Sequence, residues 1–387
     1  MRIYLDHNAT TPLAPEVAER MTSAAREIWG NASSVHHFGQ QAKAALDEAR
    51  SSVAALLGAD PSEIVFTGGG TEGDNAAIRG AAEALEPTGR RHLIASAIEH
   101  EAVLSTMKAL GRRGWRVTLL PVDTSGIVSP DRLWEAISDE TALVSVMHAN
   151  NEIGTIQPIE TLAEIAHEKG ALFHTDAVQT AGKLPISVRT LGIDLLSIAA
   201  HKFYGPKGAG ALWLRRGVRL LPFQTGGRQE RNRRAGTENV PALVGLGVAA
   251  AVARRKLESE SARLAALRDR LEEGLLTRVP GTVRNGAASP RVSNTTNVSV
   301  DRVESESLLI GLDLAGIAVS SGSACSSGTL EPSHVLKAMG LPHLRTLGSI
   351  RFSLGTSNTD ADIDRVLDTM PPLVEKLRSL TTVGTRK

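Results

Sequence analysis

The chain has 387 residues, 42% of them hydrophobic, which is enough for two domains with substantial cores. Its 43 basic and 42 acidic residues give a net charge of +1, so nothing in the charge favours nucleic acid or an anionic membrane as a partner. The single cysteine excludes an internal disulfide, the N-terminus lacks a signal-peptide pattern, and no apolar run reaches the about 18 residues that span a bilayer. We therefore expect a cytoplasmic protein.

Short β-rich runs alternate with amphipathic stretches from about residue 60 to residue 215. This alternation favours an α/β fold, with a mostly parallel sheet flanked by helices on both faces. The runs are continuously apolar, as expected for strands buried on both sides. The expected strands are Ile64–Thr67, His92–Ser96, Val117–Pro121, Ala142–His148, Ala171–Asp176, Asp194–Ile198 and Ala211–Leu214. The expected helices between them are Asn75–Leu85, Ala102–Arg112, Asp131–Ile137 and Ile159–Lys169.

The pattern changes after residue 238. Two long helices are expected at Val240–Leu257 and Arg263–Leu276, followed by short strands at Thr295–Val300 and Ile350–Ser353. We therefore expect a large domain over residues 15–258. A smaller α+β domain would consist of residues 1–14 and 259–387 and would carry a glycine- and serine-rich loop.

The most informative stretch, residues 197–210, reads SIAAHKFYGPKGAG. Lys202 follows a buried strand and precedes a glycine-proline turn, a position that suits an amine forming a Schiff base with a carbonyl ligand. Most lysines in loops are merely solvated, so the interpretation depends on the neighbouring motifs. Asp176 ends another strand, where a carboxylate can pair with a protonated pyridine nitrogen, although a helix N-cap fits it equally well. Gln179 follows and can hydrogen-bond a phenolic oxygen of such a ring.

A glycine-rich turn, residues 66–75 (FTGGGTEGDN), joins a strand to a helix. Exposed backbone N–H groups and the helix dipole at Gly70 and Thr71 favour an anion such as a phosphate. The turn lacks the lysine of a P-loop and the spacing of a dinucleotide fingerprint, so neither ATP nor NAD is supported.

Two more polar residues follow strand ends. His100 can stack on a ring and carry protons near neutral pH, although a lone loop histidine is more often structural. Asn151 follows the next strand. Four strand ends with complementary polar groups predict one shared site.

Cys325 lies in a serine- and glycine-rich segment, residues 320–328 (SSGSACSSG). A lone cysteine is usually a small buried residue. Flanks that pack poorly instead favour an exposed thiol that can reach a substrate and then a second protein. No histidine or cysteine spacing predicts a metal site.

At this point the sequence resembles a known family, the cysteine desulfurases of the NifS/IscS type. The resemblance extends from residues 4–11 (YLDHNATT) through residues 201–210 (HKFYGPKGAG), 233–241 (RRAGTENVP) and 320–328 to residues 351–355 (RFSLG). It implies a fold-type I, class V aminotransferase-like enzyme that depends on pyridoxal 5'-phosphate. It also implies that L-cysteine is converted to L-alanine and that the sulfur passes to an acceptor protein, for iron–sulfur clusters or other thio-cofactors.

The resemblance also assigns roles to residues. Lys202 would hold the cofactor covalently, Asp176 and Gln179 would hold its ring, His100 would stack on it, and Cys325 would carry the sulfur as a persulfide. The phosphate would bind Gly70, Thr71 and His201, and Asn151 would also contact the cofactor. Thr237 would reach the phosphate of a neighbouring subunit, which implies a homodimer, and Asn31 and Arg351 would bind the substrate carboxylate.

One position departs from the family pattern. Ala199 stands where many members have a serine that bonds the phosphate. Three alternatives share parts of the motif set: a selenocysteine lyase, a class V aminotransferase, and a non-catalytic scaffold with the same fold. An aminotransferase does not need Cys325, and a selenocysteine lyase would strongly prefer the selenium substrate.

Overall fold

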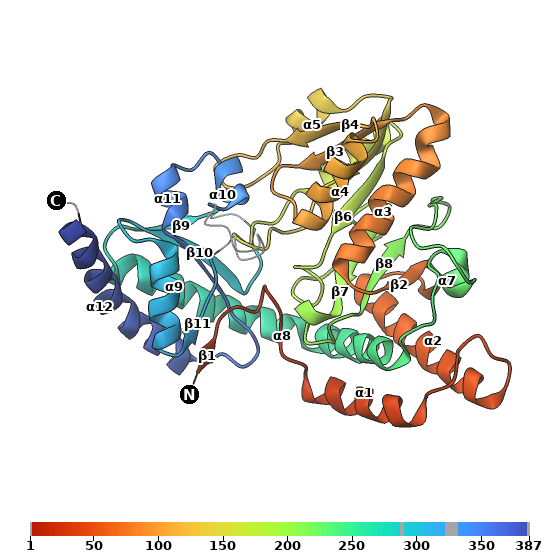
Figure 1. The fold of residues 1–387 in the computed structure, drawn as a ribbon, viewed down its shortest axis with the longest axis horizontal. Helices are drawn as coiled ribbons and strands as arrows, with labels where there is room; N and C mark the ends of the chain where they lie inside the picture. Colours follow the sequence, from red (N-terminus) through yellow and green to blue (C-terminus); the bar gives the residue numbers. More distant parts are fainter. Residues whose placement is uncertain (1, 287–289, 322–331, 385–387) are drawn as a thin grey trace.

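The computed structural model describes residues 2–286, 290–321 and 332–384. A seven-stranded sheet with the order β2-β8-β7-β6-β5-β3-β4 forms its largest part (Figure 1). Only β8 runs against the other six strands, so the predicted mostly parallel sheet is confirmed. The strands are β2 (Ile64–Thr67), β3 (His92–Ser96), β4 (Arg116–Leu120), β5 (Thr141–Ser145), β6 (Leu172–Asp176), β7 (Leu195–Ala199) and β8 (Gly210–Leu214).

Helices cover both faces of this sheet, because successive strand residues point to opposite sides. Leu195 packs into a cluster with α3 (Gly70–Leu85) and α4 (Glu101–Gly111), whereas the next residue, Leu196, packs into the cluster on the other face. The second cluster includes residues of α1 (Pro15–Glu27), α2 (His37–Leu57), α5 (Pro130–Ala136) and α6 (Ile159–Glu168). Helices α1 and α2 were not predicted from the sequence.

The expected pair of long helices is wrong. The structure has one continuous helix, α8 (Val240–Arg278), because the intervening residues 258–262 contain no proline or glycine. The helix changes partners along its length: Leu246 belongs to the cluster under the large sheet, whereas Leu271 belongs to a second core. Figure 1 shows α8 running from one half of the molecule into the other. The domain boundary expected at residues 258–259 falls inside this helix and stays a prediction.

The second core lies under a three-stranded antiparallel sheet of order β12-β10-β9. The N-terminal strand β1 pairs in parallel with β11, so the first residues return to the last third of the chain. The elements here are β1 (Ile3–Tyr4), β9 (Thr282–Asn285), β10 (Thr295–Val300), α9 (Ser305–Leu314), β11 (Ile317–Ala318), α10 (His334–Ala338), α11 (His343–Leu347), β12 (Ser349–Ser353) and α12 (Asp360–Gly384). A short helical turn, α7 (Gln229–Asn232), precedes α8. None of the helices described is both long and apolar enough to span a bilayer.

Candidate active site

The carboxyl ends of the central strands carry the polar residues that the sequence singled out. Asp176 is the last residue of β6, and Lys202 ends a short 3-10 turn directly after β7. His100 caps the N-terminus of α4, which follows β3. Because parallel strands end at one edge of the sheet, these three side chains converge there. The charge of Lys202 acts on the pKa values of both His100 and Asp176, and these two also act on each other.

Lys202 is held by the N-terminal segment of the chain. Its Nζ donates to the backbone oxygens of Asn8 and Ala9, at 2.6 and 2.7 Å. The turn that follows contains Gly205, where a Cβ atom would lie 2.7 Å from the Cβ of Ala200, so a larger residue would push this turn apart. The lysine therefore stands at a tightly packed turn.

Asp176 and His100 form an electrostatic pair in the interior. Burial raises the pKa of Asp176, and the positive charges of His100 and Lys202 partly offset that rise. Burial lowers the pKa of His100, with Asp176 acting in the opposite direction. The Nδ1 atom of His100 accepts a hydrogen bond from the backbone N–H of Ala102 at 3.1 Å, so the neutral ring carries its proton on Nε2. Asp176 caps a turn through the backbone N–H of Val178 at 2.8 Å, and no helix starts there.

The glycine-rich turn and His201, the residue before Lys202, line one pocket. Gly68, Gly70, Thr71 and His201 line it, together with Ala9, Thr10, Gly69, Glu72, Asn75, Lys207, Gly208 and Phe223. Helix α3 begins at Gly70 without a side-chain cap, so its first N–H groups face this pocket with their share of the helix dipole. Burial, together with Lys202, Lys207 and Lys183, lowers the pKa of His201 to about 4. This concentration of positive charge and free N–H groups suits a phosphate.

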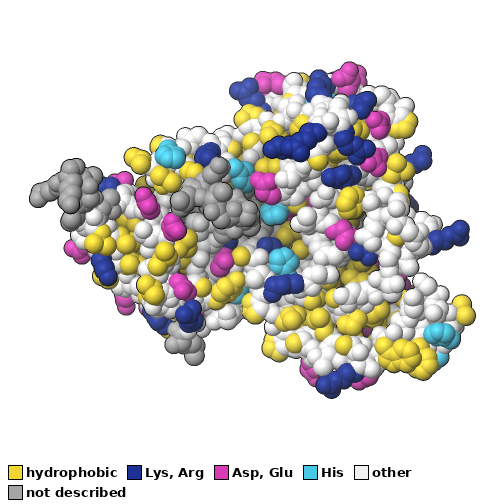
Figure 2. All heavy atoms as spheres, in the orientation of Figure 1, with side chains coloured by type: hydrophobic (Ala, Val, Ile, Leu, Met, Phe, Trp, Pro, Cys, Tyr) yellow, Lys and Arg dark blue, Asp and Glu magenta, His cyan; other side chains and the backbone are white. Residues whose placement is uncertain are grey.

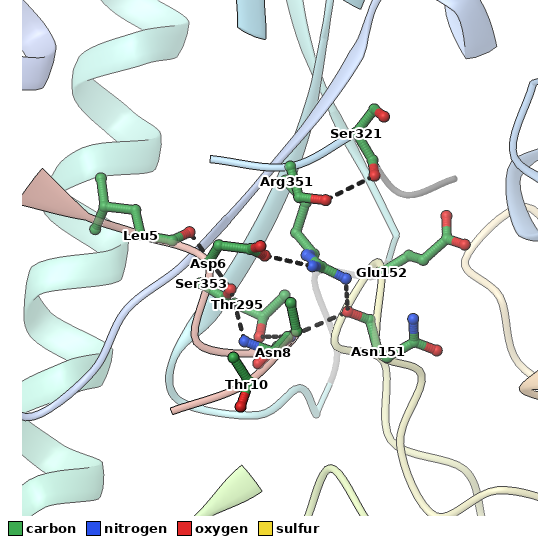
Figure 3. Close-up of polar contacts among 12 residues, drawn as sticks. Leu5, Asp6, Asn8, Thr10, Asn151, Glu152, Thr295, Ser321, Arg351 and Ser353 are labelled. Carbon is green, nitrogen blue, oxygen red and sulfur yellow. Dashed lines mark hydrogen bonds and ion pairs between the residues drawn. The ribbon is translucent and has the colours of Figure 1, made fainter. Parts of the chain in front are cut away.

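Arg351 projects from β12 into a network of buried polar groups (Figure 3). Its Nη2 atom forms an ion pair with Asp6 at 2.6 Å, and its Nη1 atom donates to the backbone oxygen of Asn151 at 3.1 Å. The Nε atom has no hydrogen-bond partner among the described residues, and the side chain is only 4% exposed. A buried guanidinium with a spare N–H can receive a carboxylate. Asn151 enters this network through its backbone oxygen.

Asn31 and Thr237 are exposed, and neither lines the pocket at the glycine-rich turn. The Asn31 side chain accepts a hydrogen bond from the backbone N–H of Ser33 at 2.9 Å. The structure of the single chain therefore does not bring these two predicted residues to the other site residues.

Cys325 lies outside the described residues. The described segments that precede and follow it, up to Ser321 and from residue 332, contact residues of the site. Ser320 pairs through its backbone with Arg351. Ser333 donates to the buried carboxyl of Glu152 at 2.5 Å, and His334 lies within 3.0 Å of the backbone oxygen of Glu99. Cys325 is four residues from Ser321, which limits their separation to about 15 Å of extended chain.

Several residues of this site were not predicted from the sequence. Asn8 is buried and joins the Lys202 turn to β10 and β12, through hydrogen bonds to Thr295 and Ser353. Two fully buried acids, Asp74 and Glu99, lie close enough to Asp176 for its negative charge to raise their pKa values. Burial is the larger cause in both, and it raises the pKa of Glu99 to about 8. The YLDHNATT motif contained Asn8, but nothing local to the motif indicates its partners.

The residues present fit pyridoxal 5'-phosphate. Lys202 supplies the amine for covalent attachment, and Asp176 supplies a buried carboxylate for the pyridine nitrogen. The pocket at Gly70, Thr71 and His201 supplies the donors for the phosphate. The fold and this set of side chains together define a fold-type I pyridoxal-phosphate enzyme.

Comparison with known proteins narrows this class. The profile of the family described as aminotransferase class-V matches residues 3–366. The chain is 52% identical to the cysteine desulfurase IscS of Methanosarcina thermophila over 379 residues, which is 98% of this chain and 93% of that protein. It is also 52% identical to a cysteine desulfurase of Gluconacetobacter diazotrophicus over 381 residues, 98% of this chain and 95% of that protein.

Solved structures of related proteins have the same fold as this chain. A NifS-like protein superimposes with a TM-score of 0.89 at 38% identity, covering 99% of this chain and 100% of that one. A structure of SspA in complex with cysteine superimposes with a TM-score of 0.81 at 38% identity, covering 92% and 99%. The chain therefore belongs to the cysteine desulfurase branch of the class-V aminotransferase family.

Proposed function

We propose that this chain is a pyridoxal-phosphate-dependent cysteine desulfurase, which takes sulfur from free L-cysteine onto Cys325 and releases L-alanine. The observation that carries the proposal is the convergence of Lys202, Asp176 and His100 at one sheet edge beside a phosphate-binding turn. The buried guanidinium of Arg351 lies beside this edge, and the ends of the Cys325 segment flank it.

Each residue has a defined task in this reaction. Bound pyridoxal 5'-phosphate would supply an electron sink for the substrate carbon that loses its proton. Asp176 would keep the pyridine nitrogen protonated, Gln179 would donate to the phenolic oxygen, and Gly70, Thr71 and His201 would hold the phosphate. Arg351 receives the substrate carboxylate through its spare N–H.

Proton transfers fall to Lys202 and His100. Lys202 removes the proton from Cα of the substrate. The charges of Asp176 and Lys202 act on the pKa of His100. His100 accepts or returns the proton of the substrate thiol.

The sulfur transfer itself uses Cys325. Its thiolate attacks the substrate sulfur, so that a sulfur–sulfur bond forms and the carbon–sulfur bond breaks. The electron pair of the broken bond remains on Cβ of the substrate. This carbon is then protonated, and the product leaves as alanine. The persulfide on Cys325 is afterwards passed to an acceptor protein.

A homodimer completes the site in this proposal. Thr237 is exposed and does not line the phosphate pocket of its own chain, which supports a role across a subunit interface. Asn31 lies between α1 and α2, in a segment where Trp29 stacks on Phe38 at 4.7 Å and Val35 is 92% exposed. Figure 2 shows hydrophobic side chains gathered where α1 and α2 meet. An exposed apolar surface of this kind suits contact with a second copy of the chain.

We also propose that the protein acts in the cytoplasm, where its single thiol stays reduced.

The test incubates the purified, cofactor-loaded protein with L-cysteine and a reductant while alanine and sulfide are measured. We expect equal amounts of both products, and neither from Cys325→Ala. A parallel reaction with L-selenocysteine tests for a selenocysteine lyase. A Cys325→Ala variant as active as the parent would contradict the proposal and favour an aminotransferase.

A further inference from the structure

A second buried lysine lies beside the proposed cofactor site. Lys183 lies in the turn after β6; the residue as a whole is half-buried, whereas its amine lies in the interior. The Nζ atom donates to Oε1 of Gln179 at 2.9 Å and to Oδ1 of Asn8 at 3.1 Å. Burial, together with the positive charges of Lys202 and Arg351, lowers the pKa of Lys183 to about 7. The reaction proposed above does not use this amine, although its burial is costly.

The partners of Gln179 fix the orientation of its side-chain amide. A lysine amine in this position donates, so the oxygen of the amide must face Lys183. The backbone oxygen of Asn8 can only accept, so the amide nitrogen must face it, at 3.0 Å. Two independent contacts therefore set the same orientation, which leaves one N–H of Gln179 for a further acceptor.

Lys183 also connects this amide to Lys202. The Asn8 backbone oxygen that accepts from Gln179 accepts from the Lys202 amine at 2.6 Å as well. The Asn8 side-chain oxygen accepts from Lys183 and from Asn294, each at 3.1 Å. The four residues Asn8, Gln179, Lys183 and Lys202 thus form one network, which we call the Asn8 network. Lys183 is the member with a titratable amine to which the proposed reaction assigns no task.

We propose that Lys183 is a positioning residue for the cofactor: its amine orients the Gln179 amide so that the N–H faces the phenolic oxygen of pyridoxal 5'-phosphate. The inference rests on the proposed function, because it presupposes that the cofactor binds here. When Lys183 is protonated, its charge also favours the negatively charged phenolic oxygen, so both effects increase cofactor retention.

The test measures the rate at which pyridoxal 5'-phosphate leaves the loaded protein, by the loss of its visible absorbance during dilution into a cofactor trap. Lys183→Met should lose the cofactor about tenfold faster than the parent, as expected when a charge-assisted contact is removed. Lys256→Met is the matched control: Lys256 lies on the exposed side of α8 and lines the same apolar cavity as Lys183, but its amine is not part of the Asn8 network. It should match the parent.

A double-mutant cycle separates positioning from general support of the fold. If Lys183 acts through Gln179, Lys183→Met should have little further effect once Gln179→Leu is present. Additive effects, or a Lys183→Met variant that retains the cofactor like the parent, would overturn the inference.

Protein stability gives the second measurement. The melting temperature of the cofactor-free Lys183→Met variant should change less than that of the loaded variant. Equal losses in both forms, or a variant that does not fold, would show a merely structural role and overturn the inference. A parent protein that binds no cofactor at all would instead refute the proposed function.

Discussion

Replacing Glu272 with glutamine should destabilise the half of the molecule that contains β10 and β12. Glu272 lies on α8, and its carboxylate accepts hydrogen bonds from Arg284, Arg291 and Thr296. Its side chain is 5% exposed. Burial alone would raise the pKa of Glu272, but the three hydrogen bonds and the charge of Arg291 outweigh it and lower the pKa to about 2.

The magnitude follows from the pKa. A carboxyl group that titrates near 4.5 when unfolded and near 2 when folded stabilises the folded state by about 3 kcal/mol at neutral pH. Because the folded pKa is the lower one, this stabilisation is complete above pH 4.5 and disappears as the pH falls toward 2. Glutamine cannot carry the charge and leaves Arg291 without its closest counter-charge, which is costly for a buried pair.

Urea unfolding of Glu272→Gln and the parent, followed by circular dichroism, measures the effect. The four tryptophans, Trp29, Trp115, Trp134 and Trp213, all belong to the proposed large domain, so their fluorescence reports on that domain alone. The circular dichroism transition of the variant should move to lower urea while the fluorescence transition moves less, which also tests the proposed division near residues 258–259. Glu273→Gln, at an exposed neighbouring position, is the control.

Two results would refute this reasoning. The first is a Glu272→Gln variant within about 0.5 kcal/mol of the parent at pH 7, the range of an ordinary surface substitution. The second is a difference between variant and parent that stays the same at pH 3 as at pH 7.

Three further predictions concern the site. Arg351→Lys keeps the charge but loses the forked geometry, so steady-state kinetics should show KM for L-cysteine rising about tenfold or more, with a smaller change in kcat. An unchanged KM would argue against a role in carboxylate binding. Gly205→Ala should spread the Lys202 turn and lower the cofactor content per chain, measured by absorbance, while Gly111→Ala, whose Cβ meets only ordinary contacts, should not. Burial raises the pKa of Glu99 to about 8 from 4.5, so the protonated carboxyl favours folding below pH 4.5 and this advantage is lost as the pH rises through 8. Glu99→Gln should therefore show a flatter fall of melting temperature between pH 6 and 9, and an unchanged fall would contradict this assignment.

Much of the fold followed from the sequence, because continuous apolar strands alternating with helices admit few arrangements. The convergence of Lys202, Asp176 and His100 followed from the same rule, since each comes at or after the end of a parallel strand. The unbroken helix α8 could not be foreseen from periodicity, because its buried face changes partners midway along its length.

Other parts of the site depend on contacts between distant residues. Asn8 meets Lys202 across 194 positions of the chain and Thr295 across 287, and no local pattern encodes such distances. In the sequence, nothing distinguishes Lys183 from an ordinary loop lysine. Only the structure shows its amine between the side-chain oxygens of Asn8 and Gln179. Asn31 and Thr237 remain predictions that need a second copy of the chain.

The central claim is that sulfur passes from L-cysteine to Cys325, and mass spectrometry tests it most directly. The loaded protein is exposed to a single equivalent of L-cysteine without reductant, and the peptides are then mapped. Because the chain has one cysteine, any persulfide can be assigned without ambiguity. We predict that the Cys325 peptide gains the mass of one sulfur atom in proportion to the alanine formed, and that Lys202→Ala gives neither. Alanine formation with an unmodified Cys325 peptide would contradict the account.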